Sequence, residues 1–282
     1  MRTSNHLIGA INFITLLLSL PLLGGGIWLS TRANSTDCLR FLQWPLIVLA
    51  LLLMVVSLAG FAGACYRNTF LMRFYLVVMF IIIVVLIGFV VFVYATTDKG
   101  SGRLLPYRAY SDYYLQDYSG WMQRRVSSYW LQISSCVRDS KVCAKMGRSF
   151  NGVPETEEMF HQRTLSPIQS GCCKPLTECQ FTYVNETTWT SNGVNFSNID
   201  CYRWNNDQQT LCYYCQSCKA GVVESVKKSW RKVSIVNVVV VILLVIIYVV
   251  AYAAYRNNKR IDNEEPLGEA RMVKMRPRFF DL

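Results

Sequence analysis

Four long apolar runs constrain this chain more than any other feature of its sequence. Each has about 20 residues or more, and as an α-helix that length spans the roughly 30 Å hydrocarbon core of a bilayer. The runs cover residues 7–29, 45–65, 74–95 and 233–255. A cleaved signal peptide is the alternative for the first run, but the run is longer than the usual apolar segment of about 7 to 15 residues. The sequence therefore predicts an all-α membrane protein built on a bundle of four transmembrane helices.

The segments between the runs differ greatly in length, and this predicts the domain organisation. Residues 30–44 form a short first loop and residues 66–73 a second, whereas residues 96–232 form a third loop long enough to fold around its own core. Residues 1–6 and 256–282 are the N-terminal segment and the C-terminal tail. An even number of spans places both termini on one face of the membrane, and the first and third loops on the other.

Basic residues do not decide which face is cytoplasmic. One group flanks the spans on the face of the termini, as expected of the cytoplasmic side: Arg2, Arg67, Arg73, Arg256, Lys259 and Arg260. Another group precedes the fourth span on the opposite face and argues the other way: Lys227, Lys228, Arg231 and Lys232.

Glycosylation sequences and cysteines give a clearer indication of orientation. All three N-glycosylation acceptor sequences lie in the first and third loops, at Asn34, Asn185 and Asn195. Ten of the eleven cysteines lie in the same loops, and disulfides persist only in oxidising compartments. We therefore expect both loops to face the cell exterior or a lumen, both termini to be cytoplasmic, and the three asparagines to be glycosylated.

The ten cysteines of these loops are an even number and allow up to five disulfides. They are Cys38, Cys136, Cys143, Cys172, Cys173, Cys179, Cys201, Cys212, Cys215 and Cys218. A bond between the neighbours Cys172 and Cys173 would close a strained ring, so each is expected to bond to a different distant partner. The spacing of the last three cysteines would suit a metal in the cytosol, but outside the cell oxidation is favoured. We expect neither a metal nor a cofactor.

The net charge of +11 does not point to a nucleic-acid partner. The third loop carries 17 Lys and Arg against 12 Asp and Glu, so much of the excess lies on the side that the cysteines place outside the cytoplasm. A solvated, mildly basic surface accounts for this excess. Attraction to acidic wall polymers or to anionic lipid headgroups is the alternative.

Small and polar residues recur at heptad spacing in the first two spans. They are Asn12, Ser19 and Gly26 in the first, and Ala50, Ser57, Gly60 and Ala64 in the second. Small residues at this period let two antiparallel helices approach closely in lipid, where no hydrophobic effect drives them together. We expect a tight helix pair in which Asn12 makes a hydrogen bond between helices rather than binding a lipid.

Cys65 stands apart from the other cysteines because it ends the second span on the cytoplasmic side. A reduced thiol at this depth is within reach of membrane acyltransferases, which predicts reversible S-palmitoylation. A small, inert boundary residue is the alternative.

Two helices are expected in the third loop. Between residues 107 and 133, aromatic residues recur every three or four positions, which predicts a helix whose aromatic stripe forms a core face rather than a binding surface. A second helix is expected to begin near Ala220 and to continue into the fourth span. The third span is likewise expected to extend outward, so that two stalks hold the domain.

Four spans with a large third loop, the stretch GCCKP at residues 171–175 and the stretch CQSCKAG at residues 215–221 resemble the tetraspanins. Lys174 and Pro175 after the cysteine pair are similar to the plant branch of that family. The resemblance covers the chain except for residues 187–200 and the last twenty residues.

The resemblance implies particular disulfides and limits one binding role. Cys172 would bond to Cys218, and Cys173 to one of Cys179, Cys201 or Cys212. Cys136 and Cys143 then look like a local pair, which leaves Cys38 as a tie between the two loops. Animal tetraspanins often carry an acidic or Gln residue in the fourth span beside a sterol cavity. Only Asn237 is present here, which puts sterol binding in doubt.

The resemblance implies a non-enzymatic scaffold that gathers other membrane proteins and further tetraspanins into lateral assemblies. Plant tetraspanins are found at the plasma membrane, at plasmodesmata and in vesicles, with roles in differentiation and communication. Shielding by glycans at Asn185 and Asn195 would leave residues 147–163 as the candidate contact segment. Two other classes remain: a four-span channel or junction subunit, for which the spans carry few polar residues, and a receptor component with its own ligand.

Overall fold

The structure is a computed structural model, and it describes most of the chain. The backbone is described for residues 2–32, 37–65, 69–147, 149–150, 153–191, 193 and 195–274. Side chains are described for residues 8–28, 47–63, 65, 70–147, 155–191, 193, 195–256 and 259. The predicted glycosylation site Asn34 and the side chains of Cys38 and Ala64 lie outside the described residues.

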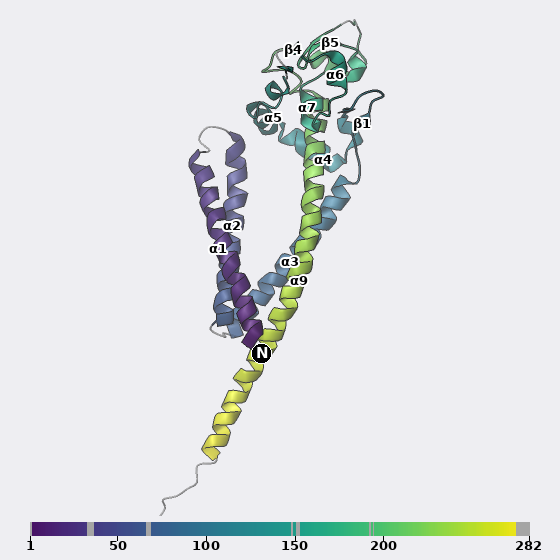
Figure 1. Ribbon diagram of the computed structural model, residues 1–282. Helices are drawn as coiled ribbons and strands as arrows, with labels where there is room; N and C mark the ends of the chain where they lie inside the picture. The colour runs from purple at the N-terminus through teal and green to yellow at the C-terminus, as the bar shows by residue number, and fades with distance from the viewer. Residues whose placement is uncertain are drawn as a thin grey trace, which may run out of the picture. The chain divides into compact units, whose positions relative to one another are not determined.

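Four helices are much longer than the others (Figure 1). They are α1 (Arg2–Arg32), α2 (Asp37–Cys65), α3 (Thr69–Thr97) and α9 (Gln216–Lys274). Among the described residues, three stretches are long and apolar enough to cross a membrane: Ile8–Trp28, Phe70–Thr97 and Gln216–Arg256. A shorter apolar stretch, Ile47–Gly63, lies in α2. The expected mostly helical membrane protein is confirmed, and its helices extend beyond the predicted spans.

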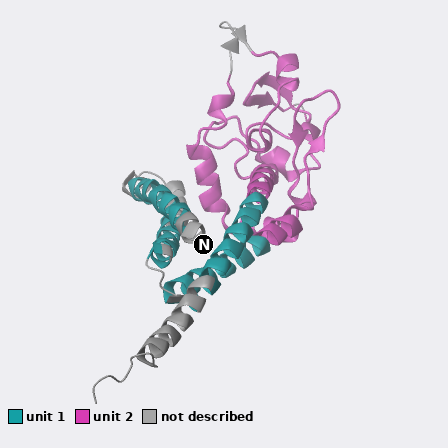
Figure 2. Cartoon of the chain, turned by 60° about the horizontal axis from the view of Figure 1, so that its bottom comes forward, with its two compact units in different colours: residues 1–32, 42–88, 237–282 teal, residues 33–41, 89–236 magenta. Residues whose placement is uncertain are grey.

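The chain divides into two compact units, which Figure 2 shows in different colours. Unit 1 comprises Met1–Arg32, Leu42–Gly88 and Asn237–Leu282, and unit 2 comprises Ala33–Phe41 and Phe89–Val236. Helices α3 and α9 each run through both units without a break. The helix expected from Ala220 into the fourth span is therefore present, and it begins four residues earlier, at Gln216.

Unit 1 is held together by a small apolar core and by buried polar side chains. Ile8, Met72, Tyr75 and Ala251 are among the core residues. Asn12 Nδ2 donates to the carbonyl of Ile8 at 2.9 Å and to the hydroxyl of Tyr75, on α3, at 3.4 Å. The polar group of Asn12 thus links α1 to α3, a helix outside the pair that the heptad seam predicts.

The heptad positions of α1 and α2 are buried wherever the side chain is described. These are Asn12, Ser19, Gly26, Ala50, Ser57 and Gly60. A Cβ atom at Gly60 would lie 2.5 Å from Asn12 Oδ1, far inside van der Waals contact. Asn12 therefore occupies the space that the missing side chain of Gly60 leaves open, which fixes the closest approach of the two helices.

Unit 2 contains a disulfide-rich domain, defined here as residues 98–232. Its helices and turns are η2 (Leu115–Asp117), α4 (Gly120–Ser128), α5 (Trp130–Asp139), η3 (Ala144–Met146), α6 (Glu157–His161), α7 (Pro167–Cys172), η4 (Thr177–Cys179), α8 (Ile199–Arg203) and the first turns of α9. Three two-stranded antiparallel sheets complete it: β1 (Arg103–Leu104) with β2 (Ser111–Asp112), β3 (Ser149–Phe150) with β4 (Val153–Pro154), and β5 (Thr182–Asn185) with β6 (Thr188–Thr190).

The helix predicted between residues 107 and 133 is wrong over its first half. Tyr107 has a positive φ of 61° and is 99% exposed, so the chain turns there before it enters β2. The first α-helix of this segment begins only at Gly120. The aromatic stripe still supplies core residues, since Tyr110 and Tyr118 are buried, but they reach the core from bends in the loop instead of from one helix face.

Replacing Gly60 with leucine is expected to destabilise unit 1, because the new side chain must displace Asn12 from its hydrogen bonds. Overpacking of this kind costs roughly 1 to 3 kcal/mol. Gly88→Leu is the matched control, since a Cβ at Gly88 has no neighbour within 4 Å. Thermal unfolding of the two full-length variants in the same detergent measures the difference, and equal midpoints would contradict the close approach.

Candidate functional site: the disulfide-rich domain

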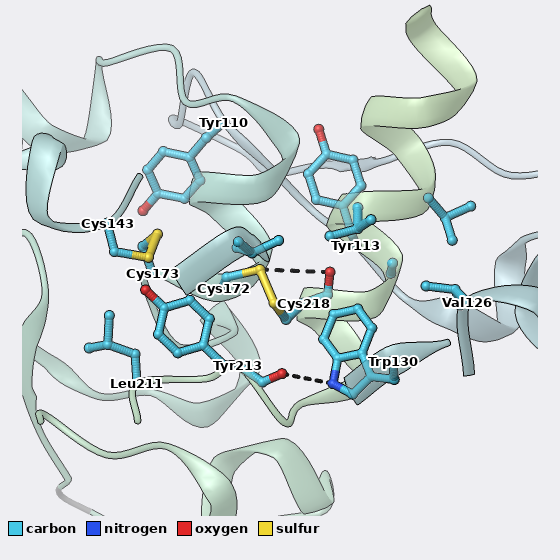
Figure 3. Packing of buried hydrophobic residues seen from close by; sticks show 14 of the residues in the cluster. Tyr110, Tyr113, Val126, Trp130, Cys143, Cys172, Cys173, Leu211, Tyr213 and Cys218 are labelled. Carbon is cyan, nitrogen blue, oxygen red and sulfur yellow. Dashed lines mark hydrogen bonds between the residues drawn. A yellow bond between two sulfur atoms is a disulfide. The ribbon is translucent and has the colours of Figure 1, made fainter. Parts of the chain in front are cut away.

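The adjacent cysteines are a branch point that ties two distant segments to one place. Cys172 is bonded to Cys218, 46 residues away, and Cys173 to Cys143, 30 residues away (Figure 3). The first bond is the one that the tetraspanin resemblance implies. The second differs from expectation, because Cys173 was assigned to Cys179, Cys201 or Cys212. Both cysteines of the pair are fully buried.

The local pair expected between Cys136 and Cys143 is also wrong, since Cys143 bonds to Cys173. Cys136 is disulfide-bonded as well, to another residue. Two further bonds close shorter loops: Cys179–Cys201 and Cys212–Cys215. All three cysteines of the CxxCxxC stretch are therefore in disulfides, Cys212 with Cys215 and Cys218 with Cys172.

Helix α7 delivers the branch point because its sequence fixes where it begins and ends. Ser166 and Gln169 form a capping box, in which each side chain accepts a hydrogen bond from the other residue's backbone N–H. Pro167 follows at the first helical position, where its missing N–H costs nothing. The helix ends at Cys172, which places both cysteines at its C-terminal end.

Two glycines let α7 cross α9 at backbone contact. A Cβ at Gly171 would lie 2.4 Å from the carbonyl oxygen of Ser217, and a Cβ at Gly221 would lie 2.3 Å from that of Pro167. The hydroxyl of Ser217 donates to the Gly171 carbonyl at 3.0 Å. Any larger residue at either glycine would separate the helices and strain the Cys172–Cys218 bond beside them. The glycines of GCCKP and CKAG thus belong to one packing contact.

Lys174, the residue after the cysteine pair, is part of a buried ion pair. Its Nζ lies 2.6 Å from Asp112 Oδ1, and both side chains are only 1% exposed. The other carboxylate oxygen of Asp112 accepts the backbone N–H of Thr177 at 2.9 Å, and the ammonium lies 4.7 Å from the ring centroid of Tyr110. A buried charge must be paired, and this pair ties β2 to the segment after α7.

Burial and ion pairing shift the pKa of each partner, Asp112 and Lys174, in opposite directions. Burial raises the pKa of Asp112, but the Lys174 ammonium and the Thr177 donors outweigh it, so the pKa of Asp112 lies below its usual value. Burial lowers the pKa of Lys174, against the effect of Asp112. The ionised form of Asp112 is therefore favoured by folding.

Asp200 fixes the start of α9 from a remote position. Its two carboxylate oxygens accept the backbone N–H groups of Gln216 at 2.9 Å and Ser217 at 2.8 Å. Unpaired N–H groups at a helix N-terminus favour such a negative partner. Because Asp200 precedes Cys201, the Cys179–Cys201 bond also holds this cap in place.

Two of the four basic residues before the fourth span, Lys227 and Arg231, bind backbone carbonyls at and just after the C-terminal end of α3. Arg231 donates to the carbonyl of Thr97 at 2.9 Å. Lys227 donates to the carbonyls of Lys99, at 3.3 Å, and of Gly100. The last carbonyls of a helix lack partners within the helix, so Arg231 satisfies the end of α3 while Lys227 holds the turn that follows it.

The domain also contains one open pocket of about 600 Å³ next to the Asp200 cap. Polar side chains predominate in its lining, among them Arg103, Gln116, Glu178 and Asn198. Arg103 is paired with Asp117 at 2.9 Å, and Asn198 donates to Glu178. Asn198 and Glu178 thus bind each other and Arg103 binds a residue outside the lining, and the lining shows no acid, base and nucleophile set in catalytic order.

The remaining predicted sites fall outside this buried framework. Asn185 is exposed at the end of β5, and Asn195 is exposed in the segment before α8. Cys65 is exposed and free at the end of α2.

Sequence reasoning missed the ionic and capping roles of Asp112 and Asp200. A charge within the aromatic stretch YSDYY was the available signal for Asp112, because such a residue needs a partner if its neighbours form a core.

The fold and the disulfide framework define a membrane protein with several apolar helices and a cysteine-rich domain before the last of them. The Tetraspanin family matches residues 4–255. Among relatives from Arabidopsis thaliana, Tetraspanin-3 is 69% identical over the whole of both chains, and Tetraspanin-4 is 64% identical over 98% of this chain and 85% of its own. Protein TORNADO 2 is 45% identical over 93% and 96%. No solved structure matches.

This chain belongs to the tetraspanin family, as its motifs predict. Tetraspanins are not known as enzymes, and members generally interact with other membrane proteins.

Removing the long-range disulfide is expected to cost more stability than removing the short-range one. Chain-entropy estimates give about 4 kcal/mol for a loop the size of Cys172–Cys218 and less than 2 kcal/mol for one the size of Cys212–Cys215. Thermal unfolding of the Cys172→Ser/Cys218→Ser and Cys212→Ser/Cys215→Ser variants compares them. Equal losses of stability in the two variants would show that the Cys172–Cys218 bond contributes no more than the short-range bond.

Asp112→Asn is expected to destabilise the domain by about 3 to 5 kcal/mol, because it leaves the Lys174 ammonium buried without a counter-charge. Asp117→Asn, which breaks only the exposed pair with Arg103, is the control and should have little effect. The stabilisation from Asp112 is complete above the ordinary aspartate pKa of about 3.9 and is lost as the pH falls through the lowered folded value. Unfolding of the Asn variant should therefore depend less on pH in acid, and parallel acid profiles would contradict this.

Proposed function

We propose that this protein is a membrane scaffold that organises lateral assemblies of membrane proteins and other tetraspanins, in plant cell differentiation, communication or vesicle-related processes. It would span the membrane four times with both termini in the cytoplasm. The plasma membrane is the proposed principal location, with plasmodesmata, endomembranes and vesicles as further ones. Family membership and the apolar helices support the membrane role.

The observation that carries this proposal is that the family signature is buried. Residues 171–176, which contain GCCKP, have no exposed member. The signature therefore builds the interior of the domain and offers nothing to a partner. Recognition then depends on the surface that this framework displays, which suits a protein whose domain presents contacts to neighbours in the same membrane.

Residues 147–163 remain the proposed contact segment. Within it, Thr156 to Met159 are exposed at the start of α6, while Phe160 is fully buried. Arg163 fixes the base of the segment through the Met146 carbonyl and Glu155, each at 2.9 Å. Glu157, Glu158 and Met159 therefore form an exposed face on a rigid base, away from the acceptor sites Asn185 and Asn195 in the sequence.

Alanine at Glu157, Glu158 and Met159 is expected to reduce co-precipitation of cross-linked partners in mild detergent several-fold, with folding unchanged because all three side chains are exposed. Alanine at Arg138, Lys141 and Lys145, exposed residues at the end of α5 and in the segment that follows it, is the matched control. Quantitative mass spectrometry of the precipitates makes the comparison. Unchanged partner recovery by the α6 variant would refute this contact face.

We also propose that Cys38 is the partner of Cys136, which would tie the first loop to the disulfide-rich domain. The argument is by elimination. Every other cysteine is either in one of the four described bonds or, like Cys65, free. Disulfide mapping by mass spectrometry tests the assignment, which would fail if Cys38 were recovered as a free thiol.

Cys65 is the proposed site of S-palmitoylation, which would add a lipid anchor at the cytoplasmic end of α2. Its thiol is free and exposed, as an acyltransferase requires. We expect thioester-selective labelling of the expressed protein to disappear in the Cys65→Ser variant. Labelling that persists in this variant would place the acyl group elsewhere.

A further inference from the structure

Seven basic residues gather around the junction between the apolar helices and the disulfide-rich domain. They are Lys99, Arg124, Arg125, Lys227, Lys228, Arg231 and Lys232, against the acidic residues Asp98 and Glu224. Lys227 and Arg231 are occupied at the end of α3, and Tyr118 donates to Glu224 at 2.9 Å. The hydrogen bonds to the end of α3 therefore account for only part of this charge.

Four of the cations have no strong protein partner among the described residues. Arg124 and Arg125 lie on α4, and Lys228 and Lys232 lie on α9; all four are exposed. Lys228 comes within 3.8 Å of Glu224, but its side chain is 57% exposed. A surface pair of this kind contributes little. These four residues are called the basic collar below.

Aromatic contacts fix the depth of the collar on the α4 side. The ring of Trp121, on α4, packs edge-on against Phe92 of α3 at 5.1 Å between centroids and lies 6.4 Å from Trp230 of α9. Phe92 lies five residues, about 7.5 Å, before the end of the apolar helix at Thr97. The Arg125 guanidinium lies 5.7 Å from the Trp121 ring. The Trp121 end of α4 is thus held at the boundary of the apolar region.

The α9 side of the collar lies at a similar depth. The apolar run of the sequence begins at Val233, so Lys232 is one residue and Lys228 five residues beyond it, or about 1.5 and 7.5 Å along the helix. The headgroup layer on each side of a hydrocarbon core is roughly 5 to 7 Å thick. All four cations therefore reach the layer that contains lipid phosphates.

We propose that the basic collar binds the phosphate groups of anionic lipids in the leaflet that faces the disulfide-rich domain. Tryptophan rings at the membrane interface with arginine beside them suit this layer, and a guanidinium can bind two oxygens of one phosphate. Each cation near an anionic membrane surface adds to the attraction. This site rests on the proposed orientation of the scaffold, and it would enrich anionic lipids around each copy.

The test is photo-crosslinking of the full-length protein in vesicles that carry photoactivatable phosphatidylglycerol or phosphatidylcholine. Peptides from α4 and from the start of α9 are quantified separately from those of the cytoplasmic side. We expect these peptides to capture the anionic probe about fivefold more than the zwitterionic one. Neutralising the collar by Arg124→Gln, Arg125→Gln, Lys228→Gln and Lys232→Gln should bring the ratio close to one, whereas Arg124→Lys with Arg125→Lys should keep most of the preference.

The matched control removes the same charge from another part of the domain by Arg138→Gln, Lys141→Gln, Lys145→Gln and Arg203→Gln, and it should leave the ratio unchanged. Equal capture of both probes by the wild type, or an equal loss in the control, would overturn the proposal. Removal of the preference by millimolar inorganic phosphate would do the same, because it would identify a free anion as the ligand.

Two measurements on the same variants separate this site from the scaffold role and from misfolding. If the neutralised variants unfold at the same temperature as the wild type in detergent, a lost lipid preference is a binding effect and not misfolding. If the fourfold variant unfolds, the double variant Arg124→Gln with Arg125→Gln repeats the test. Co-precipitation of partners reports the proposed function independently. If the protein prefers anionic lipid but recruits no partners, the scaffold role is contradicted and the collar proposal stands. If it recruits partners but shows no lipid preference, the collar proposal is contradicted and the scaffold role stands.

Discussion

The backbone contact between α7 and α9, locked by the bond from Cys172 to Cys218, is the constraint on which the rest of the domain depends. Gly171 and Gly221 permit the contact, and the bond next to it prevents the helices from separating. Once α7 is fixed, Cys173 positions Cys143 and the segment after α5, and Lys174 positions Asp112 and β2. A five-residue stretch therefore positions elements that are far apart in the sequence, by three kinds of interaction: backbone packing, covalent bonds and a buried ion pair.

This arrangement places the residues that hold the framework together in the interior and leaves the surface for recognition. The signature residues are inside, where their chemistry supports the framework, whereas the exposed residues of α6, Asn185 and Asn195 are on the surface. The same logic applies to the charges. Arg231 satisfies the end of α3 and Lys227 the turn after it, whereas the collar cations are exposed to the surroundings. The basic residues 227–232, which conflict with the positive-inside rule, thus divide between two roles: binding backbone carbonyls near the end of α3 and, as proposed, binding lipid phosphates.

Much of this could be predicted from sequence, for identifiable reasons. Apolar runs and heptad periods are local patterns, so the long helices and the continuation of α9 from the domain into the last span followed from them. The partner of Cys173 did not follow, because disulfide connectivity depends on where the chain folds back and several pairings fit the same spacing. The helix expected from residue 107 failed because periodicity cannot register the turn at Tyr107 or the pairing of Asp112 with a residue 62 positions away.

The central claim is that the neighbouring cysteines hold two different distant segments, and disulfide mapping of the mature protein tests it most directly. Proteolysis under non-reducing conditions, followed by mass spectrometry, is expected to yield one cross-linked cluster in which the peptide with Cys172 and Cys173 is joined to those with Cys218 and Cys143. Recovery of Cys172 and Cys173 bonded to each other, or of both as free thiols, would contradict the account.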